Sequence, residues 1–382
     1  TAAMAENIAG VRVVQAFSRE DENLSRFVDL HSTYNQSALA AARVFHTYMP
    51  FVGLMSGVGT AIILGYGGSL VLQREITVGE LAAFVLYLGM FFGPIQTMGD
   101  LYNAMLSTAA SAERIFQLLD TEPQVRNRPN AVALPPIQGR VVFEKVWFRY
   151  DTTPAGSWVL EDIDFEVEAG RTIALVGHTG SGKTSIVSLL ARFYEPQRGR
   201  ILVDGIDLAT TTVESLHEQI GIVTQENFLF TGTVMENLKF GRPGATDEEV
   251  MTAAGILGTH DIILRLKDGY QTRVGERGGN LSAGERQLLT FTRAMVAQPR
   301  ILILDEATSA VDGRTERVIQ HALEQLFARR TCFVVAHRLS TVRHADCILV
   351  LDHGRIIERG THDELLRQGG HYAKLHEEFV RE

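Results

Sequence analysis

Cysteine is scarce in this chain of 382 residues, which contains only Cys332 and Cys347. Two cysteines are too few for a disulfide framework and lack metal-ligand spacing, which favours a reducing, cytosolic setting. An excess of basic residues is also lacking. The formal net charge of -9 gives no indication of nucleic-acid binding, which usually requires a basic domain. Internal repeats and low-complexity tracts are absent too. With 45% hydrophobic and 21% charged residues, the composition predicts a folded protein with room for two or three domains.

Charge is missing altogether from two long apolar segments. Residues 44–72 contain no Asp, Glu, Lys or Arg, and residues 81–99 contain none either. A helix needs about 20 apolar residues to cross a bilayer, so both segments are long enough or nearly so. A pair of buried helices in a soluble α-domain is the alternative. Because the short polar turn 73–75 separates the two segments, we expect a membrane hairpin with spans at 44–72 and 79–100.

The regions around the hairpin have patterns of their own. In residues 1–43 apolar side chains recur at intervals of three, four and seven, which predicts a polar helical arm with one packed stripe, interrupted at Gly10. The basic residues of this arm weakly place both ends of the hairpin in the cytoplasm. Residues 101–120 continue as a helical extension, and the four prolines of residues 121–139 indicate a linker. The chain begins at Thr1 without an initiator methionine or a signal peptide, so we expect a piece of a longer protein.

From about residue 140 to 382 the pattern alternates between strands and helices. We expect strands at 141–143, 147–150, 172–176, 301–304 and 332–336, and helices at 185–193 and 314–328. This alternation predicts an α/β domain with a doubly wound parallel sheet, whose ligand lies at the carboxyl ends of the strands.

The strand at 172–176 is followed by a glycine-rich motif that fits a phosphate-binding loop. The motif G-x-x-x-x-G-K-T consists of Gly177, His178, Thr179, Gly180, Ser181, Gly182, Lys183 and Thr184, with Ser185 next. Glycines let backbone N–H groups approach phosphates, and the following helix adds a favourable dipole. Lys183 would hold the β- and γ-phosphates, and the Thr184 hydroxyl would bind Mg²⁺. The alternative is a chance glycine-rich turn.

A second chemical element is the pair Asp305–Glu306 at the end of the apolar strand 301–304. A carboxylate at a strand end beside the phosphate loop can reach Mg²⁺ through water, and we assign this role to Asp305. Glu306 is then placed to orient or deprotonate the water that attacks the γ-phosphate. Adjacent acids can also merely begin a helix.

Residues 281–287, L-S-A-G-E-R-Q, resemble the signature motif of ATP-binding cassette (ABC) ATPases, which is usually L-S-G-G-Q. The resemblance covers some 200 residues, with further matches in order. It implies a P-loop ATPase domain with these roles: adenine stacking by Tyr150, Mg²⁺ contact by Gln225, a D-loop ending at Asp312, and a γ-phosphate contact by the switch residue His337. It implies catalysis by Glu306, His337 and Lys183, and a metal site of Thr184, Gln225 and Asp305. The residues that would contact ATP are Tyr150, 177–185, Gln225, Asp312 and, from a partner chain, Ser282 and Gly284.

The first part of the chain is similar to exporters of this family that fuse the membrane and nucleotide domains. Residues 76–81 and 112–116 resemble the region of the fifth and sixth membrane helices, and residues 6–17 resemble the coupling loop before the fifth. The resemblance implies a half-transporter that lacks its first four membrane helices. It implies a lipid-embedded dimer in the plasma or inner membrane, with cytoplasmic nucleotide domains joined head to tail around ATP. We expect a homo- or heterodimer and a small-molecule, lipid or peptide substrate.

Two residues depart from the usual signature. Ala283 replaces a glycine, and Glu285 replaces glutamine and brings a negative charge near the partner's ATP. Repulsion would weaken closure or slow turnover, whereas a carboxylate that faces solvent would be harmless. Three rival readings stay open at this point. They are a soluble ABC ATPase acting on DNA or ribosomes, half of a heterodimer with unequal sites and a partly regulatory role, and the ATPase subunit of an importer.

Overall fold

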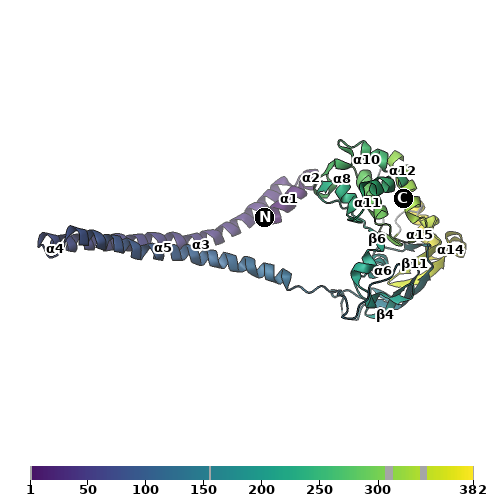
Figure 1. Cartoon of the computed structure of the whole chain (residues 1–382), viewed down its shortest axis with the longest axis horizontal. Coiled ribbons are helices and arrows are strands. Elements are labelled where there is room, and N and C mark those ends of the chain that lie inside the picture. The colour runs from purple at the N-terminus through teal and green to yellow at the C-terminus, as the bar shows by residue number, and fades with distance from the viewer. Residues whose placement is uncertain (1, 155, 306–312, 336–341, 382) are drawn as a thin grey trace. The chain divides into compact units, whose positions relative to one another are not determined.

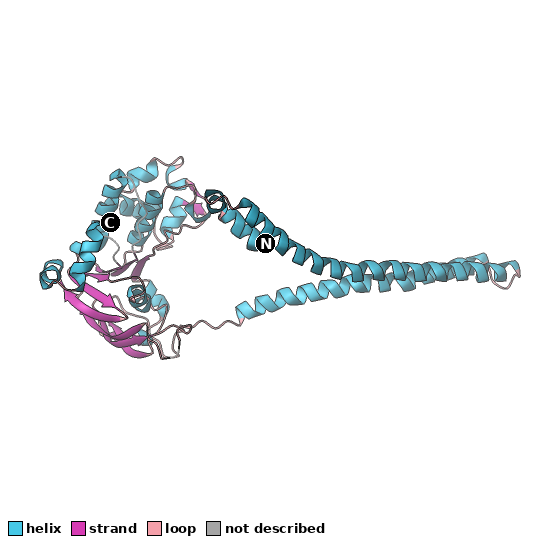
Figure 2. Ribbon diagram, turned by 180° about the vertical axis from the view of Figure 1, so that it is seen from behind, coloured by secondary structure: helices cyan, strands magenta, loops and turns pink. Residues whose placement is uncertain are grey.

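The computed structural model of the chain describes residues 2–154, 156–305, 313–335 and 342–381 (Figure 1). The chain divides into two compact units, Thr1–Glu122 and Pro123–Glu382. The first unit is helical. The second contains all the β-strands and the remaining helices (Figure 2).

The first unit is dominated by two long helices that lie side by side and run in opposite directions (Figures 1 and 2). The short helices α1 (Ala2–Ala9) and α2 (Val11–Ala16) precede α3 (Glu20–Ile62), which continues through a π-helical turn (Ile63–Gly67) into α4 (Gly68–Leu72). After a turn, α5 spans Val78–Leu119. The expected arm is thus interrupted twice, at Gly10 and again at residues 17–19, where Ser18 has a φ of 50°. Thr77 and Glu80 exchange hydrogen bonds in a capping box, which explains why α5 begins at Val78.

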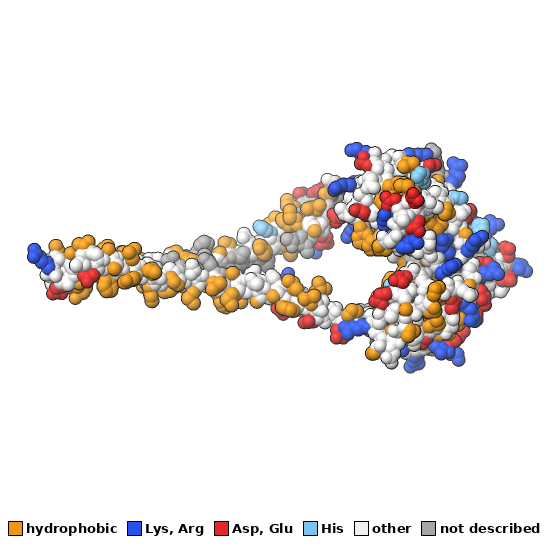
Figure 3. Space-filling model, viewed as in Figure 1, with side chains coloured by type: hydrophobic (Ala, Val, Ile, Leu, Met, Phe, Trp, Pro, Cys, Tyr) orange, Lys and Arg blue, Asp and Glu red, His pale blue; other side chains and the backbone are white. Residues whose placement is uncertain are grey.

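Two helical segments of this unit are long and apolar enough to cross a membrane. Among the described residues these are Thr47–Leu72 and Val78–Leu119, with mean hydropathy of 1.5 and 1.7. Their apolar windows are almost entirely exposed, with 6% and 0% of residues buried, so neither is the buried core helix of a soluble domain. Hydrophobic side chains accordingly cover the surface of the hairpin (Figure 3).

Glycines let the two long helices approach each other closely. A Cβ at Gly59 would lie 3.1 Å from Leu88 Cδ2, and one at Gly67 would lie 2.6 Å from Leu81 Cδ1. The hydroxyl of Tyr48 adds a hydrogen bond of 2.8 Å to the carbonyl oxygen of Ile95. Small residues at close helix contacts are the usual means of association in a bilayer, where burial from water does not drive packing.

The second unit is built around a six-stranded sheet with the order β12-β11-β3-β10-β9-β6. The pairings that link β11, β3, β10, β9 and β6 are parallel, and β12 runs antiparallel to β11. The strands are β3 (Thr172–Val176), β6 (Ile220–Val223), β9 (Ile301–Asp305), β10 (Thr331–Val335), β11 (Cys347–Asp352) and β12 (Arg355–Gly360).

Successive side chains of these strands enter two different hydrophobic cores. Ile173, Leu175 and Ile303 belong to one core, while Leu302 and Leu304 belong to the other. Because neighbouring side chains of a strand point to opposite faces, the two cores lie on opposite faces of the sheet.

The first core contains α6 (Lys183–Leu190), α7 (Val213–His217) and an antiparallel sheet of order β2-β1-β4-β5. Its strands are β1 (Val141–Phe148), β2 (Leu160–Val167), β4 (Arg198–Val203) and β5 (Ile206–Asp207). The expectation of separate strands at 141–143 and 147–150 is therefore wrong. A single strand, β1, covers 141–143 and continues to Phe148, so residues 149 and 150 lie outside it. Lys145, with a φ of 47°, lies at an irregularity in its pairing.

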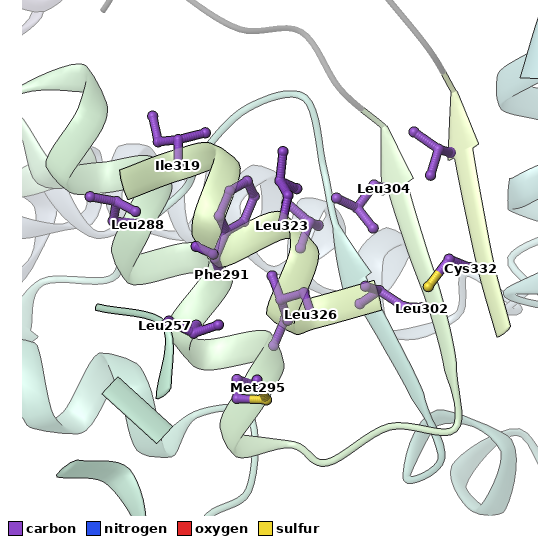
Figure 4. Packing of buried hydrophobic residues seen from close by; sticks show 14 of the residues in the cluster. Leu257, Leu288, Phe291, Met295, Leu302, Leu304, Ile319, Leu323, Leu326 and Cys332 are labelled. Carbon is purple, nitrogen blue, oxygen red and sulfur yellow. The ribbon is translucent and has the colours of Figure 1, made fainter. Parts of the chain in front are cut away.

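Helices form almost all of the second core on the side that faces away from the sheet. Its largest helices are α11 (Ala283–Val296) and α12 (Gly313–Phe327). Figure 4 shows Leu323 and Leu326 of α12 beside Leu304 and Leu302 of β9. The smaller elements are α8 (Val234–Lys239), α9 (Asp247–Ile256), α10 (His260–Leu264), α14 (His362–Gln368), α15 (His371–Arg381) and the strand pair β7 (Gly232–Thr233) and β8 (Arg273–Val274).

The proline-containing segment after Glu122 carries no helix or strand among its described residues, yet its second half is anchored. Leu134 and Ile137 are buried, the N–H of Leu134 donates to Ser215 Oγ over 2.8 Å, and that of Ile137 donates to Gln219 Oε1 over 2.9 Å. This part of the segment therefore belongs to the second unit.

Candidate functional site

The carboxyl ends of four strands bring the predicted phosphate-binding residues to one edge of the sheet. In β10, Val335 pairs with Leu175 of β3 and with Asp305 of β9, so these three strands end side by side. The loop 177–182 follows β3, and Gln225 follows β6, the neighbour of β9. The glycine-rich motif at residues 177–184, called the P-loop below, thus lies with Asp305 and Gln225 along the edge where ligands of such sheets bind.

The loop itself adopts a conformation that needs glycine. Gly177, Gly180 and Gly182 have φ values of 153°, 84° and 104°. A Cβ at Gly177 would lie 2.2 Å from the carbonyl oxygen of Leu351, and one at Gly182 would lie 2.5 Å from Leu160 Cδ2. His178, Thr179 and Gly180 are exposed at the outside of the loop, so its backbone is accessible to a phosphate.

Lys183 begins α6, and its ammonium group turns back onto the loop. Nζ donates to the carbonyl oxygens of Gly177 and His178 over 2.7 and 2.9 Å. Burial lowers the pKa of Lys183, and the negative charge of Asp305 opposes this shift. The structure therefore confines a buried positive charge beside the loop and within electrostatic reach of Asp305.

Two hydroxyl groups of the loop fit a phosphate and a metal ion. The side chain of Ser181 is 4% exposed, and among the described residues its Oγ has no hydrogen-bond partner. Thr184, in the first turn of α6, is exposed and can reach a ligand from outside. Hydroxyl and carboxylate oxygens are ligands that Mg²⁺ accepts, so Thr184, Asp305 and the amide of Gln225 form a suitable donor set.

Tyr150 lies next to the P-loop helix, as the adenine-stacking role requires. Its hydroxyl is 3.0 Å from Ser185 Oγ, and its ring meets those of Phe148 and Tyr194 edge-on, with centroids 4.7 and 5.0 Å away. Tyr150 is only half-buried, and a hollow of about 360 Å³ lies beside these three rings.

The signature residues lie elsewhere in the fold. Ser282 caps the N-terminus of α11, and Gly284 is buried in its first turn. Because α11 packs in the second core and α6 in the first, the signature helix and the P-loop helix lie on opposite faces of the sheet. The structure does not gather Ser282 and Gly284 into the group formed by the P-loop, Asp305 and Gln225.

Three predicted residues lie outside the described part of the chain: Glu306, Asp312 and His337. The described strands β9 and β10 end at Asp305 and Val335. The assignments of these residues therefore rest on the sequence.

One contributor to the site was missed in the sequence. The turn after β11 closes against the P-loop, because the N–H of Gly354 donates to the carbonyl oxygen of Ser181 over 3.2 Å and Leu351 abuts Gly177. The only signal is a short Asp-His-Gly-Arg turn between two apolar strands, which predicts a hairpin but not its contact with the loop.

Two family descriptions match this chain. The family described as "ABC transporter" matches residues 160–309, which contain the P-loop, the signature and Asp305, and "ABC transporter transmembrane region" matches residues 1–95. The chain belongs to the ABC transporter family. The predicted fold class is thereby confirmed: an α/β P-loop ATPase domain joined to a helical transmembrane fragment with long helices. The two family matches also confirm two predictions for this chain: an ATP-binding domain and a transmembrane region.

Similar proteins carry both regions in one longer chain. This ABC chain is 48% identical over 370 residues to the uncharacterized ABC transporter ATP-binding protein YknV of Bacillus subtilis, covering 97% of itself and 61% of that protein. It is 43% identical to a fatty acid ABC transporter ATP-binding/permease protein of Mycobacterium bovis, covering 97% and 58%. A solved bacterial Atm1-family ABC exporter with ATP bound matches with a TM-score of 0.79 and 38% identity, covering 98% of this chain and 65% of that one. The chain thus spans about three fifths of the curated relatives' length.

Proposed function

We propose that this chain is part of an ABC half-transporter that hydrolyses ATP to export a substrate across the cell membrane. The observation that carries the ATPase assignment is the convergence of the P-loop, with its confined Lys183, and Asp305 at one edge of the sheet. Within this proposal, residues 1–43 form the coupling loop, 44–72 and 79–100 the membrane spans, 101–120 an extension, 121–139 the linker and 140–382 the nucleotide domain.

The phosphates would be bound by the backbone of residues 177–182 and by Lys183. Thr184, Gln225 and Asp305 would hold Mg²⁺, which when bound neutralises charge on the phosphate oxygens. Glu306 would accept a proton from the attacking water, and His337 would contact the γ-phosphate. Tyr150, Ser185 and Asp312 would complete the contacts to the nucleotide.

A second chain would supply the signature. Since α6 and α11 pack on opposite faces of the sheet, two nucleotide domains placed head to tail would set Ser282 and Gly284 of one against the P-loop of the other. ATP favours the closed pair because its phosphates interact with both chains there, and hydrolysis removes that preference. The arm at residues 1–43 would pass the motion to the membrane helices.

The substrate is proposed as a small molecule, a lipid or a peptide. Lipid substrates are the first to test, because one relative is named a fatty acid transporter and another, 40% identical and from Syntrophus aciditrophicus, an ATP-dependent lipid A-core flippase. The nucleotide domain would face the cytoplasm, where ATP is available.

The decisive experiment uses the full-length transporter in lipid nanodiscs. Glu306→Gln keeps the shape of the side chain and removes the base, so we expect ATP hydrolysis to fall by about 100-fold or more while ATP still binds. Hydrolysis as fast as in the parent would contradict the assignment of Glu306. Failure of the parent to hydrolyse ATP at all would contradict the proposed function.

A further inference from the structure

Ser282 and Glu285 exchange two hydrogen bonds at the start of α11. The backbone N–H of Ser282 donates to Glu285 Oε2 over 2.7 Å, and the N–H of Glu285 donates to Ser282 Oγ over 3.2 Å. A serine hydroxyl that accepts a bond from its own helix keeps its proton for a partner outside the helix. The capping box therefore orients Ser282 as a donor.

The same bonds hold the carboxylate of Glu285 at the N-terminal end of α11, which is the end of a helix that attracts anions. The positive end of the helix dipole and the first N–H groups of the helix attract negative charge. The carboxylate of Glu285 already supplies a negative charge at this end and accepts the N–H of Ser282. While its N–H donates to Glu285, Ser282 cannot donate that N–H to a phosphate. A phosphate at the Ser282 hydroxyl would also lie close to the carboxylate charge and be repelled by it. The carboxylate is thus turned towards the signature serine rather than away into solvent.

On the basis of the proposed function, we propose that Glu285 is a positioning residue that sets the ATP concentration at which two chains close. Its backbone orients the Ser282 hydroxyl towards the partner's ATP. Its carboxylate competes with the γ-phosphate for the same helix end and raises the ATP concentration needed for closure.

Capping alone is the competing explanation, because the chain contains other boxes of this kind. Thr361 and Glu364 at the start of α14 make the same two bonds: the N–H of Thr361 donates to Glu364 Oε2 over 2.8 Å, and the N–H of Glu364 donates to Thr361 Oγ1 over 3.4 Å. That box lies at a helix to which the proposed function assigns no nucleotide contact. If Glu285 only caps α11, its replacement changes stability and leaves the response to ATP unaffected.

The test compares Glu285→Gln with the matched control Glu364→Gln in the full-length transporter in nanodiscs. The glutamine carbonyl can accept the same N–H bond, so Glu285→Gln removes the charge and keeps the cap. We expect its KM for ATP to fall about three- to tenfold at low ionic strength, without a rise in kcat, because the closed state gains stability. Raising the salt from about 20 mM to about 300 mM should shrink the difference, since salt screens charge repulsion. Glu364→Gln should keep the parent KM at both salt concentrations.

An unchanged KM in Glu285→Gln, or a change that salt does not reduce, would overturn the proposal. If Glu285→Gln does not fold, Glu285→Ala provides the same readout. It removes the charge and the bond from the Ser282 N–H to the side chain, and it keeps the bond from the backbone N–H of residue 285 to Ser282 Oγ, so it should lower both KM and thermal stability. A parent without ATPase activity would refute the proposed function, whereas an active parent with an unresponsive Glu285→Gln would refute only this inference.

Discussion

Leu189 of α6 and Phe291 of α11 pack against opposite faces of the six-stranded sheet. The helix that begins at Lys183 and the helix that begins after Ser282 are therefore separated by the sheet. This arrangement is the structural reason to expect that each ATP site draws on two chains.

Mixing two inactive variants tests that expectation. Lys183→Met removes the P-loop charge, and Ser282→Ala removes the signature hydroxyl, so each variant alone should lose ATPase activity by about 100-fold. In a mixed head-to-tail dimer one of the two sites combines an intact Lys183 with an intact Ser282. Co-expression of differently tagged chains and purification through both tags should restore a substantial part of the activity. Continued inactivity of the doubly purified dimer would indicate that Lys183 and Ser282 of the same chain form one site.

The second prediction concerns the contact between Gly177 and Leu351. Gly177→Ala would place its Cβ 2.2 Å from a backbone oxygen, so something rigid must move. We expect a loss of about 3 kcal/mol or more and a fall in melting temperature of several degrees. Gly180→Ala is the control, because its φ is also positive but no atom lies within 4 Å of its Cβ. It should cost about 1–2 kcal/mol from backbone strain alone. Equal melting temperatures of the two variants would show that the Leu351 contact is not restrictive.

The third prediction concerns the helix contact at Gly67. Gly67→Leu would drive a side chain into Leu81, 2.6 Å from the position of the Cβ, and so should separate α4 from the start of α5. We expect a loss of about 1–3 kcal/mol, read as a lower melting temperature in nanodiscs. Gly65→Leu, two residues away, has no atom within 4 Å of its Cβ and should behave like the parent. The same loss in both variants would mean that hydrophobic bulk, rather than this contact, is responsible.

The fourth prediction is a loss of stability at alkaline pH. Burial raises the pKa of the Cys332 thiol from 9.0 to about 12, and the pKa values of Tyr270 and Tyr372 from 10.0 to about 12. The unfolded chain therefore releases these protons at lower pH than the folded chain does. The contribution of these groups to stability is complete below about pH 9 and is lost as the pH rises towards about 12.

Denaturant unfolding followed by tryptophan fluorescence measures this effect. The midpoint should fall between about pH 8 and about pH 10.5, and Cys332→Ala should reduce the slope because it removes one of the three groups. A midpoint independent of pH across this range would contradict the burial of the ionisable groups.

Local patterns were sufficient to predict much of the candidate site. The P-loop was predicted from the spacing of Gly177, Gly182 and Lys183, because this order of residues between a strand and a helix lets the backbone surround a phosphate. Asp305 was found because it ends an apolar strand, and parallel strands end at the same edge. The membrane spans were predicted from two long uncharged apolar runs, and the structure has apolar, exposed helices at Thr47–Leu72 and Val78–Leu119.

Other features could not be derived in this way. The antiparallel sheet was missed because its pairs are distant in sequence, as in Val141 with Val167 and with Val203, and because Lys145 interrupts the alternation of β1. The contact of Leu351 with Gly177 was missed because 174 positions separate the two residues and no motif marks it. The direction of the Glu285 carboxylate stayed open, because a capping box and a solvent-facing side chain have the same sequence.

The sequence by itself determined the chemistry that we predict for this protein: a loop suited to phosphates, a carboxylate suited to a metal ion and two apolar runs long enough for a bilayer. Residue type and spacing are enough for these, since each depends on neighbours a few positions away. Only the tertiary structure decided which elements share a face of the sheet, so that the P-loop and signature helices are divided and Leu351 closes on Gly177. Such relations arise from the packing of side chains distant in sequence, and the local pattern does not encode them.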